Sequence, residues 1–142
     1  MVAEAVAGAK EPWWIIGSAA MALHGAGPIQ VGDVDLLMSR RDAAWLLEQH
    51  GLAAGPGSAH DRFRSDVFGS LALGGFPVEV MSGFHVRDGG RWRELVPRSR
   101  IRTDVGGAAL FIPSVHELIE MCSLFARPKD RERERLLREV LT

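Results

Sequence analysis

Short apolar runs separated by turn residues recur along the chain, and their length indicates β-strands. Residues 13–16, Trp-Trp-Ile-Ile, are too few for a helix and rich in strand formers, so they predict a buried strand. Residues 33–38 predict a second strand, in which acidic and aliphatic side chains alternate. Val34 and Leu36 are therefore expected on the face opposite the acidic side chains.

Two longer stretches further along predict a hairpin. Residues 62–73 alternate weakly and residues 76–81 are again apolar, while Gly74 and Gly75 between them favour a turn. A last short strand is expected over residues 108–112.

Helical spacing predicts two helices in the first half of the chain. Residues 18–23 form a short helical pattern that the Ser18 hydroxyl could cap. Ser39 and Asp42 form a capping box, and the helix that they begin is expected to close at Gly51. Residues 1–12 predict a loose lead-in or one short helix.

Two more helices are expected near the C-terminus. Ser114 and Glu117 form a second capping box, and Cys122 falls on the apolar stripe of the helix that follows, as a core residue would. Residues 129–141 combine dense mixed charge with an apolar stripe that should dock the helix on the core. The members of that stripe are Leu136, Leu137, Val140 and Leu141.

These elements fit one domain. A chain of 142 residues is long enough for a single hydrophobic core but not for two. We therefore expect residues 1–142 to form one α/β (α+β) domain, in which a small mixed β-sheet carries helices packed mainly on one face.

Composition and charge restrict the function only broadly. Apolar residues make up 46% of the chain and charged residues 25%, as in an ordinary globular domain. The formal net charge of −1 does not favour nucleic acid as a partner. Cys122 is the only cysteine, which excludes an internal disulfide. No apolar segment approaches the ~20 residues of a membrane span, and the N-terminus lacks a secretory signal pattern, so a cytoplasmic location without a membrane partner is expected.

Three acidic residues and a Gly-Ser pair are candidate ligands for a metal and a phosphate. Asp33 and Asp35 are two residues apart in a strand, so both carboxylates project to one face and need a cation such as Mg²⁺ between them. Gly17 and Ser18 precede a helix and offer free N–H groups and a hydroxyl to a phosphate. Glu79 lies between two valines, where a buried carboxylate would need a partner or a metal, unless that face is solvated.

The order of these residues resembles the nucleotidyltransferase superfamily that includes DNA polymerase β. Within it, the chain looks most like the small bacterial enzymes of the abortive-infection and antibiotic-modifying type. The signature is an apolar strand, Gly-Ser or Gly-Gly, a short helix and then Asp-x-Asp on the next strand. The matching residues are Gly17, Ser18, Ala20, Leu23, His24, Gly25, Asp33, Asp35 and Leu36. Residues 113–131 add a second similarity, Pro-Ser-x-x-Glu-Leu-Ile followed by Arg-Pro-Lys-Asp-Arg.

The resemblance implies transfer of a nucleoside monophosphate from a nucleoside triphosphate (NTP) to an unknown hydroxyl acceptor, with two Mg²⁺ ions. It implies that Asp33, Asp35 and Glu79 are the catalytic and metal-binding residues. Glu79 could also accept the proton of the attacking hydroxyl. Gly17 and Ser18 would hold the β- and γ-phosphates.

The chain also departs from the family pattern. Members commonly have a lysine near Met121 and Cys122, an acidic residue near Arg133, and Arg-Thr within residues 29–31. These differences leave open a catalytically inactive module of the same fold that acts through a protein partner or as a homodimer. A phosphohydrolase or nuclease would use the same carboxylates but lacks its usual histidine pairs, and only His24 is expected near the site.

Two other segments have alternative interpretations. Residues 82–102 interleave arginines with Trp92 and a Gly-Gly turn. They predict either a positive rim for a triphosphate or an RNA end, or a solvated β-excursion. Residues 51–60 are rich in Gly and Ala and predict a flexible loop that could border a site.

Overall fold

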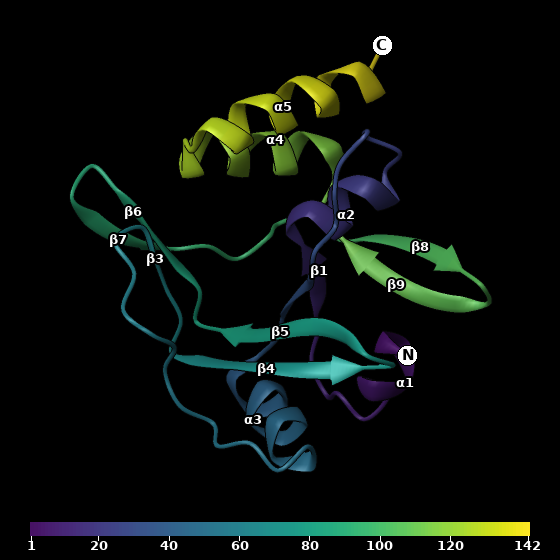
Figure 1. The fold of residues 1–142 in the computed structure, drawn as a ribbon, viewed down its shortest axis with the longest axis vertical. Coiled ribbons are helices and arrows are strands. Elements are labelled where there is room, and N and C mark those ends of the chain that lie inside the picture. Colours follow the sequence, from purple (N-terminus) through teal and green to yellow (C-terminus); the bar gives the residue numbers. More distant parts are fainter.

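A four-stranded mixed sheet forms the centre of the computed structural model, which describes residues 1–142 (Figure 1). Its strands are β1 (Trp14–Ile16), β2 (Val34–Leu37), β4 (Val67–Leu73) and β5 (Phe76–Ser82). They are arranged in the order β1-β2-β5-β4, with β2 and β5 parallel and the two outer pairs antiparallel. The α/β class and the small mixed sheet are as the sequence predicted.

The β4–β5 hairpin is closed by the glycine pair between its strands. Gly74 and Gly75 have φ angles of +59° and +82°, and a tight hairpin turn needs this left-handed conformation at both central positions. The strands pair from Leu73 and Phe76 onward, which confirms the predicted hairpin.

The predicted strand at residues 62–73 is wrong in its extent, because the structure divides it in two. β3 (Phe63–Arg64) pairs with β6 (His85–Asp88) and not with β5. The division comes at Asp66, whose N–H still donates to the Ser82 carbonyl at 2.9 Å. β3 and β6 form a second sheet with β7 (Arg91–Glu94), so residues 82–102 contain a β-excursion.

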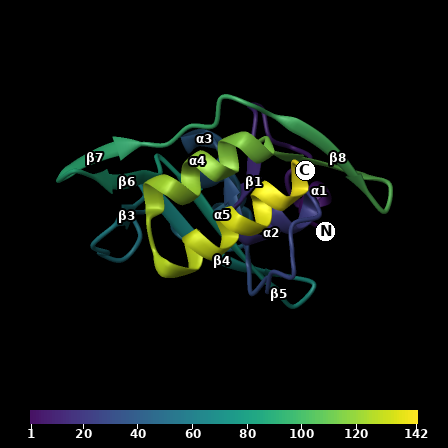
Figure 2. The same cartoon turned by 90° about the horizontal axis from the view of Figure 1, so that it is seen from above.

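A third, two-stranded sheet is the hairpin of β8 (Ile101–Val105) and β9 (Ala108–Ile112). β9 was predicted, and it packs against β1. The hairpin projects from the body of the molecule in both views (Figures 1 and 2).

Five helices complete the fold. They are α1 (Val2–Ala5), α2 (Gly17–Leu23), α3 (Arg40–Gln49), α4 (Val115–Phe125) and α5 (Pro128–Val140). α3 packs against β4 and β5, whereas α4 and α5 pack against each other on the other side of that hairpin (Figure 1). Figure 2 shows α4 and α5 side by side. None of these helices has the length and hydropathy needed to cross a membrane.

The serine caps were predicted correctly at two places and wrongly at one, but neither predicted capping box is complete. The Asp42 and Glu117 carboxylates accept N–H groups of other segments instead. The hydroxyls of Ser39 and Ser114 accept the N–H groups of Asp42 and Glu117, each at 3.1 Å. Ser18 does not cap α2, because the helix already begins at Gly17 and the extended residue before it has no capping side chain.

The apolar stripe predicted for the last helix is only half buried. Leu136 and Leu137 are 5% and 0% exposed and join the core. Val140 and Leu141 are 36% and 47% exposed, because the end of α5 extends past the elements that it packs against.

Candidate functional site

Three carboxylates meet at the β2–β5 pair. The parallel register places Asp35 directly beside Glu79, and Asp33 lies two residues before Asp35, just ahead of β2. One carboxylate oxygen from each residue lies within 4.8 Å of the others. All three side chains are partly buried. The face of β5 that carries Glu79 is therefore not fully solvated.

Two of these carboxyl groups, those of Asp35 and Glu79, have raised pKa values. Burial, followed by the charge of Asp33, raises the pKa of Asp35 to about 6. A hydrogen bond with Asp33, burial and the charge of Asp35 raise the pKa of Glu79 to about 7. Both pKa values rise because three negative groups share a small, poorly solvated volume without a cation between them. Oxygen donors of this kind are the ligands that Mg²⁺ takes in proteins.

The junction of β1 and α2 lies against this cluster. Gly17 has a φ of +70°, and a Cβ at this position would be 2.7 Å from Oδ2 of Asp35. Only glycine therefore combines the required turn with close approach to the carboxylate. Ser18 follows with 8% of its surface exposed and lines the same cleft as the acids.

The cluster opens into a cleft of about 460 Å³. Its floor holds Gly17, Ser18 and the carboxylates, and part of its wall is aromatic. The aromatic members are Phe63, Phe68, Phe84 and Phe125, together with His60. The predicted flexible loop contributes Gly57, Ser58 and His60, so it does border the site.

Basic side chains from the α4–α5 junction line the same cleft. Arg127 is held by the fully buried Asp130, with Nε 2.6 Å from Oδ2. Lys129 and Arg133 form no ion pair within the chain. Although burial raises the pKa of Asp35 overall, these three cations act against that rise. The cleft is thus lined both by clustered acids and by two unpaired cations, Lys129 and Arg133.

These basic residues were not predicted from the sequence to line the site. Arg133 stood out only as a departure from an acidic position, and Lys129 only as part of a similarity. Nothing local in the sequence signals that the start of α5 faces strands almost one hundred residues earlier. The structure brings them together through the packing of α4 and α5.

The histidine prediction was also wrong. His24 does not line the cleft, because its Nε2 is 2.7 Å from the Pro113 carbonyl oxygen and joins α2 to the start of α4. His60, in the loop, is the histidine that lines the cleft. Cys122 is buried in the core as predicted, and burial raises the pKa of its thiol to about 12.

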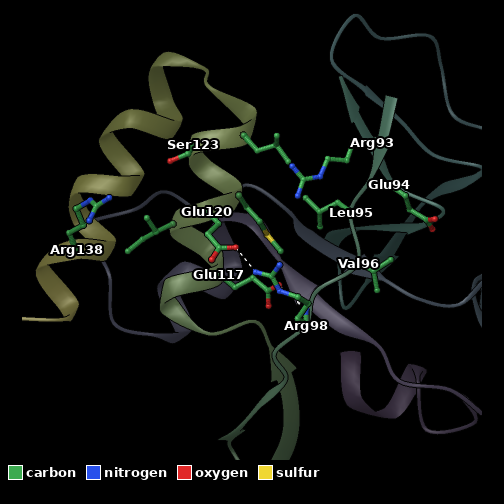
Figure 3. Close-up of a pocket in the computed structure, with 12 residues that line it drawn as sticks. Arg93, Glu94, Leu95, Val96, Arg98, Glu117, Glu120, Ser123 and Arg138 are labelled. Atoms are coloured by element: carbon green, nitrogen blue, oxygen red, sulfur yellow. Dashed lines mark hydrogen bonds and ion pairs between the residues drawn. The ribbon is translucent and has the colours of Figure 1, made fainter. Parts of the chain in front are cut away.

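A larger hollow of about 610 Å³ lies between the segment after β7 and the α4–α5 pair (Figure 3). Its charged groups, apart from Glu94, are already paired. Glu117 accepts the N–H groups of Arg98 and Ser99 at 2.7 and 2.8 Å, and Arg98 forms an ion pair with Glu120 at 2.7 Å. Although burial alone would raise the pKa of Glu117, these hydrogen bonds lower it. These bonds join the segment after β7 to α4. The clustered carboxylates and the unpaired Lys129 and Arg133 lie in the other cleft.

Solved structures of nucleotidyltransferases share the fold. The chain matches TM1012 of Thermotoga maritima, provisionally described as a nucleotidyltransferase, at 22% identity and a TM-score of 0.74, over 99% of this chain and 88% of that one. ANT(2″)-Ia, solved with adenylyl-2″-tobramycin, matches at 14% identity and a TM-score of 0.57, over 98% and 84%. The lincosamide antibiotic adenylyltransferase LnuA, solved with lincomycin, matches at 9% identity and a TM-score of 0.56, over 91% and 87%.

No protein-family model and no curated protein sequence matches the chain. At the identities given above, the structural likeness establishes the fold. The chain has the nucleotidyltransferase fold, as the sequence resemblance predicted.

Proposed function

We propose that this protein is a metal-dependent nucleotidyltransferase that moves a nucleoside monophosphate from an NTP to a hydroxyl acceptor. The observation that carries the proposal is the cleft itself, which is lined by three clustered carboxylates and by unpaired cations within a nucleotidyltransferase fold. An NTP bound with Mg²⁺ needs both kinds of group, because the metal needs oxygen ligands and the phosphates need positive charge.

Asp33, Asp35 and Glu79 would hold the metal. The donor set fits Mg²⁺, because it consists of three clustered, partly buried carboxylates, and carboxylate oxygens are the ligands that Mg²⁺ prefers. When bound, Mg²⁺ supplies stabilisation of the charge on the triphosphate and makes the attacking hydroxyl more acidic.

The phosphates would bind to donors that line the cleft. Lys129 and Arg133 are free to bind phosphate oxygens, since neither is committed to an acid of the chain. Arg127 is held in place by Asp130 and contributes mainly fixed positive charge. In the same cleft, Gly17 leaves room for close approach, and the N–H and hydroxyl of Ser18 offer donors to the β- and γ-phosphates.

Glu79 is the candidate general base. Its pKa is about 7 in the metal-free protein, and a bound cation would lower it, so that the carboxylate is ionised and able to accept a proton at neutral pH. It would accept the proton of the acceptor hydroxyl as the new bond to the α-phosphorus forms and pyrophosphate leaves. One structural neighbour is described as an antibiotic-resistance factor and another as a lincosamide antibiotic adenylyltransferase, so a small-molecule hydroxyl is one class of acceptor to be tested here.

Transfer can be measured with NTPs that carry the label on the α-phosphate. The protein is incubated with Mg²⁺, each labelled NTP and separate fractions of small molecules, RNA and protein as acceptors. We expect label to enter one fraction and Glu79→Gln to reduce that transfer by about 10²-fold or more.

Asp61→Asn is the matched control. Asp61 is exposed, forms no ion pair and lies outside the cleft lining, so its loss should leave transfer unchanged. Transfer that survives Glu79→Gln would contradict the role of the carboxylates. Label in no fraction would instead favour a catalytically inactive module of this fold.

A further inference from the structure

The outer edge of the β8–β9 hairpin is free. β8 pairs only with β9, while β9 packs against β1 and α1 and so faces the body of the protein. Figure 1 shows the hairpin projecting beyond the central sheet. The N–H and C=O groups along the outer side of β8 are therefore available to another strand, and such edges are usually blocked or paired.

The side chains of β8 are unusually exposed for their type. Ile101 and Val105, at its two ends, are 41% and 46% exposed, although both are large aliphatic residues. Between them, Arg102 and Asp104 project to the other face of the strand, with both side chains about two-thirds exposed. Thr103 occupies the centre of the strand.

This arrangement is complementary to itself. If two β8 strands pair antiparallel about a two-fold axis at Thr103, Ile101 of one copy lies opposite Val105 of the other. Arg102 then lies opposite Asp104 of the second copy, and Asp104 opposite Arg102. Shifting the register by one residue would instead place an aliphatic residue opposite a charged one, so this register is the one that matches every pair.

We propose that β8 is a homodimerisation edge, and that two copies of the chain join their hairpins into a continuous four-stranded sheet in the order β9-β8-β8-β9. Charge complementarity indicates that the strand pairing with β8 is the β8 of a second copy. The order aliphatic, positive, polar, negative, aliphatic places a suitable residue opposite each position when two such strands run antiparallel.

The small size of this contact predicts a weak dimer. Cross-strand pairs contribute modestly, and a contact confined to five residues per copy is small beside stable protein interfaces. The dimer should therefore form with increasing protein concentration. The Arg102–Asp104 ion pair within each copy, at 3.1 Å, exchanges for the same pair between copies, so the number of ion pairs is unchanged.

The test is analytical ultracentrifugation of the full chain from low to high micromolar concentration. The wild type should pass from monomer to dimer. Arg102→Asp or Asp104→Arg alone places like charges opposite each other twice in the symmetric dimer, and should raise the dissociation constant by about tenfold or more. The double variant, with both substitutions, exchanges the charges and should restore the dimer.

A matched control and a folding check complete the test. Arg91→Asp makes the same charge change at an exposed arginine of another hairpin and should leave dimerisation unchanged. Circular dichroism and melting temperature should show that all variants are folded. A wild type that is monomeric throughout would overturn the proposal. A dimer that persists in both single variants, or is not restored by the double variant, would overturn the β8 register.

Discussion

At the scale of single residues, Asp35 shows how burial and charge oppose each other at the site. Burial and Asp33 raise its pKa to about 6, so the folded protein retains a proton that the unfolded chain has lost near pH 4. The folded state therefore binds more protons between these values, and its stability falls as the pH rises through that window. Above it, the ionised Asp35 destabilises the metal-free protein.

Replacing Asp35 by Asn should remove this cost. In the presence of a metal chelator at pH 7.5, we expect the melting temperature of Asp35→Asn to exceed that of the wild type by a few degrees. This corresponds to about 1 kcal/mol or more for a domain of this size. Near pH 4 the gap should close, because the wild-type carboxyl is then protonated as well.

Thermal melts at both pH values make the comparison. Adding Mg²⁺ and an NTP should reverse the order at pH 7.5, because only the wild type gains stability by binding them. An Asn variant that is less stable than the wild type at every pH without metal would mean that Asp35 mainly holds the fold together.

At the scale of elements, the junction between β1 and α2 couples backbone conformation to the site. Gly17 adopts φ +70° at the first position of α2 and lies against the Asp35 carboxylate. Gly25, just beyond the same helix, has a similar φ of +86°, but nothing lies within 4 Å of its missing Cβ. The two glycines share the backbone requirement, and only one of them touches the carboxylates.

This difference separates backbone strain from crowding of the site. Gly17→Ala and Gly25→Ala should each lose about 1 to 2 kcal/mol of stability from the left-handed conformation. Gly17→Ala should also displace Asp35 and weaken Mg²⁺-dependent NTP binding about tenfold or more, whereas Gly25→Ala should bind as the wild type does. Equal binding by the two variants, measured calorimetrically, would show that Gly17 serves the backbone alone.

Elements whose signals are local were predictable from the sequence. The β4–β5 hairpin follows from Gly74 and Gly75, and α3 and α4 begin where Ser39 and Ser114 cap them. The division of residues 62–73 was not predictable, because β3 takes its partner from β6, some twenty residues later. A pairing of this kind depends on the whole fold and leaves no local pattern.

At the scale of the whole molecule, the cleft combines segments from both ends of the chain. The sequence predicted that Asp33, Asp35 and Glu79 belong together, because the strand pattern and the family resemblance both pointed to them. The roles of these residues remain predictions. Lys129 and Arg133 were not predicted, since their place depends on how α4 and α5 pack over the carboxylate side of the molecule.

We propose that acids and cations from these distant segments form one site for an NTP and its metal. Calorimetric titration of ATP, GTP, CTP and UTP into the protein, with and without Mg²⁺, is the decisive experiment. The same titrations use Asp33→Ala/Asp35→Ala and, as a control outside the cleft, Asp61→Asn.

We expect at least one NTP to bind the wild type and Asp61→Asn only when Mg²⁺ is present, and not to bind the double alanine variant. Binding that ignores the metal or the two aspartates would contradict a metal-dependent nucleotide site. So would the absence of binding by all four NTPs, and the fold would then have to work through a partner instead.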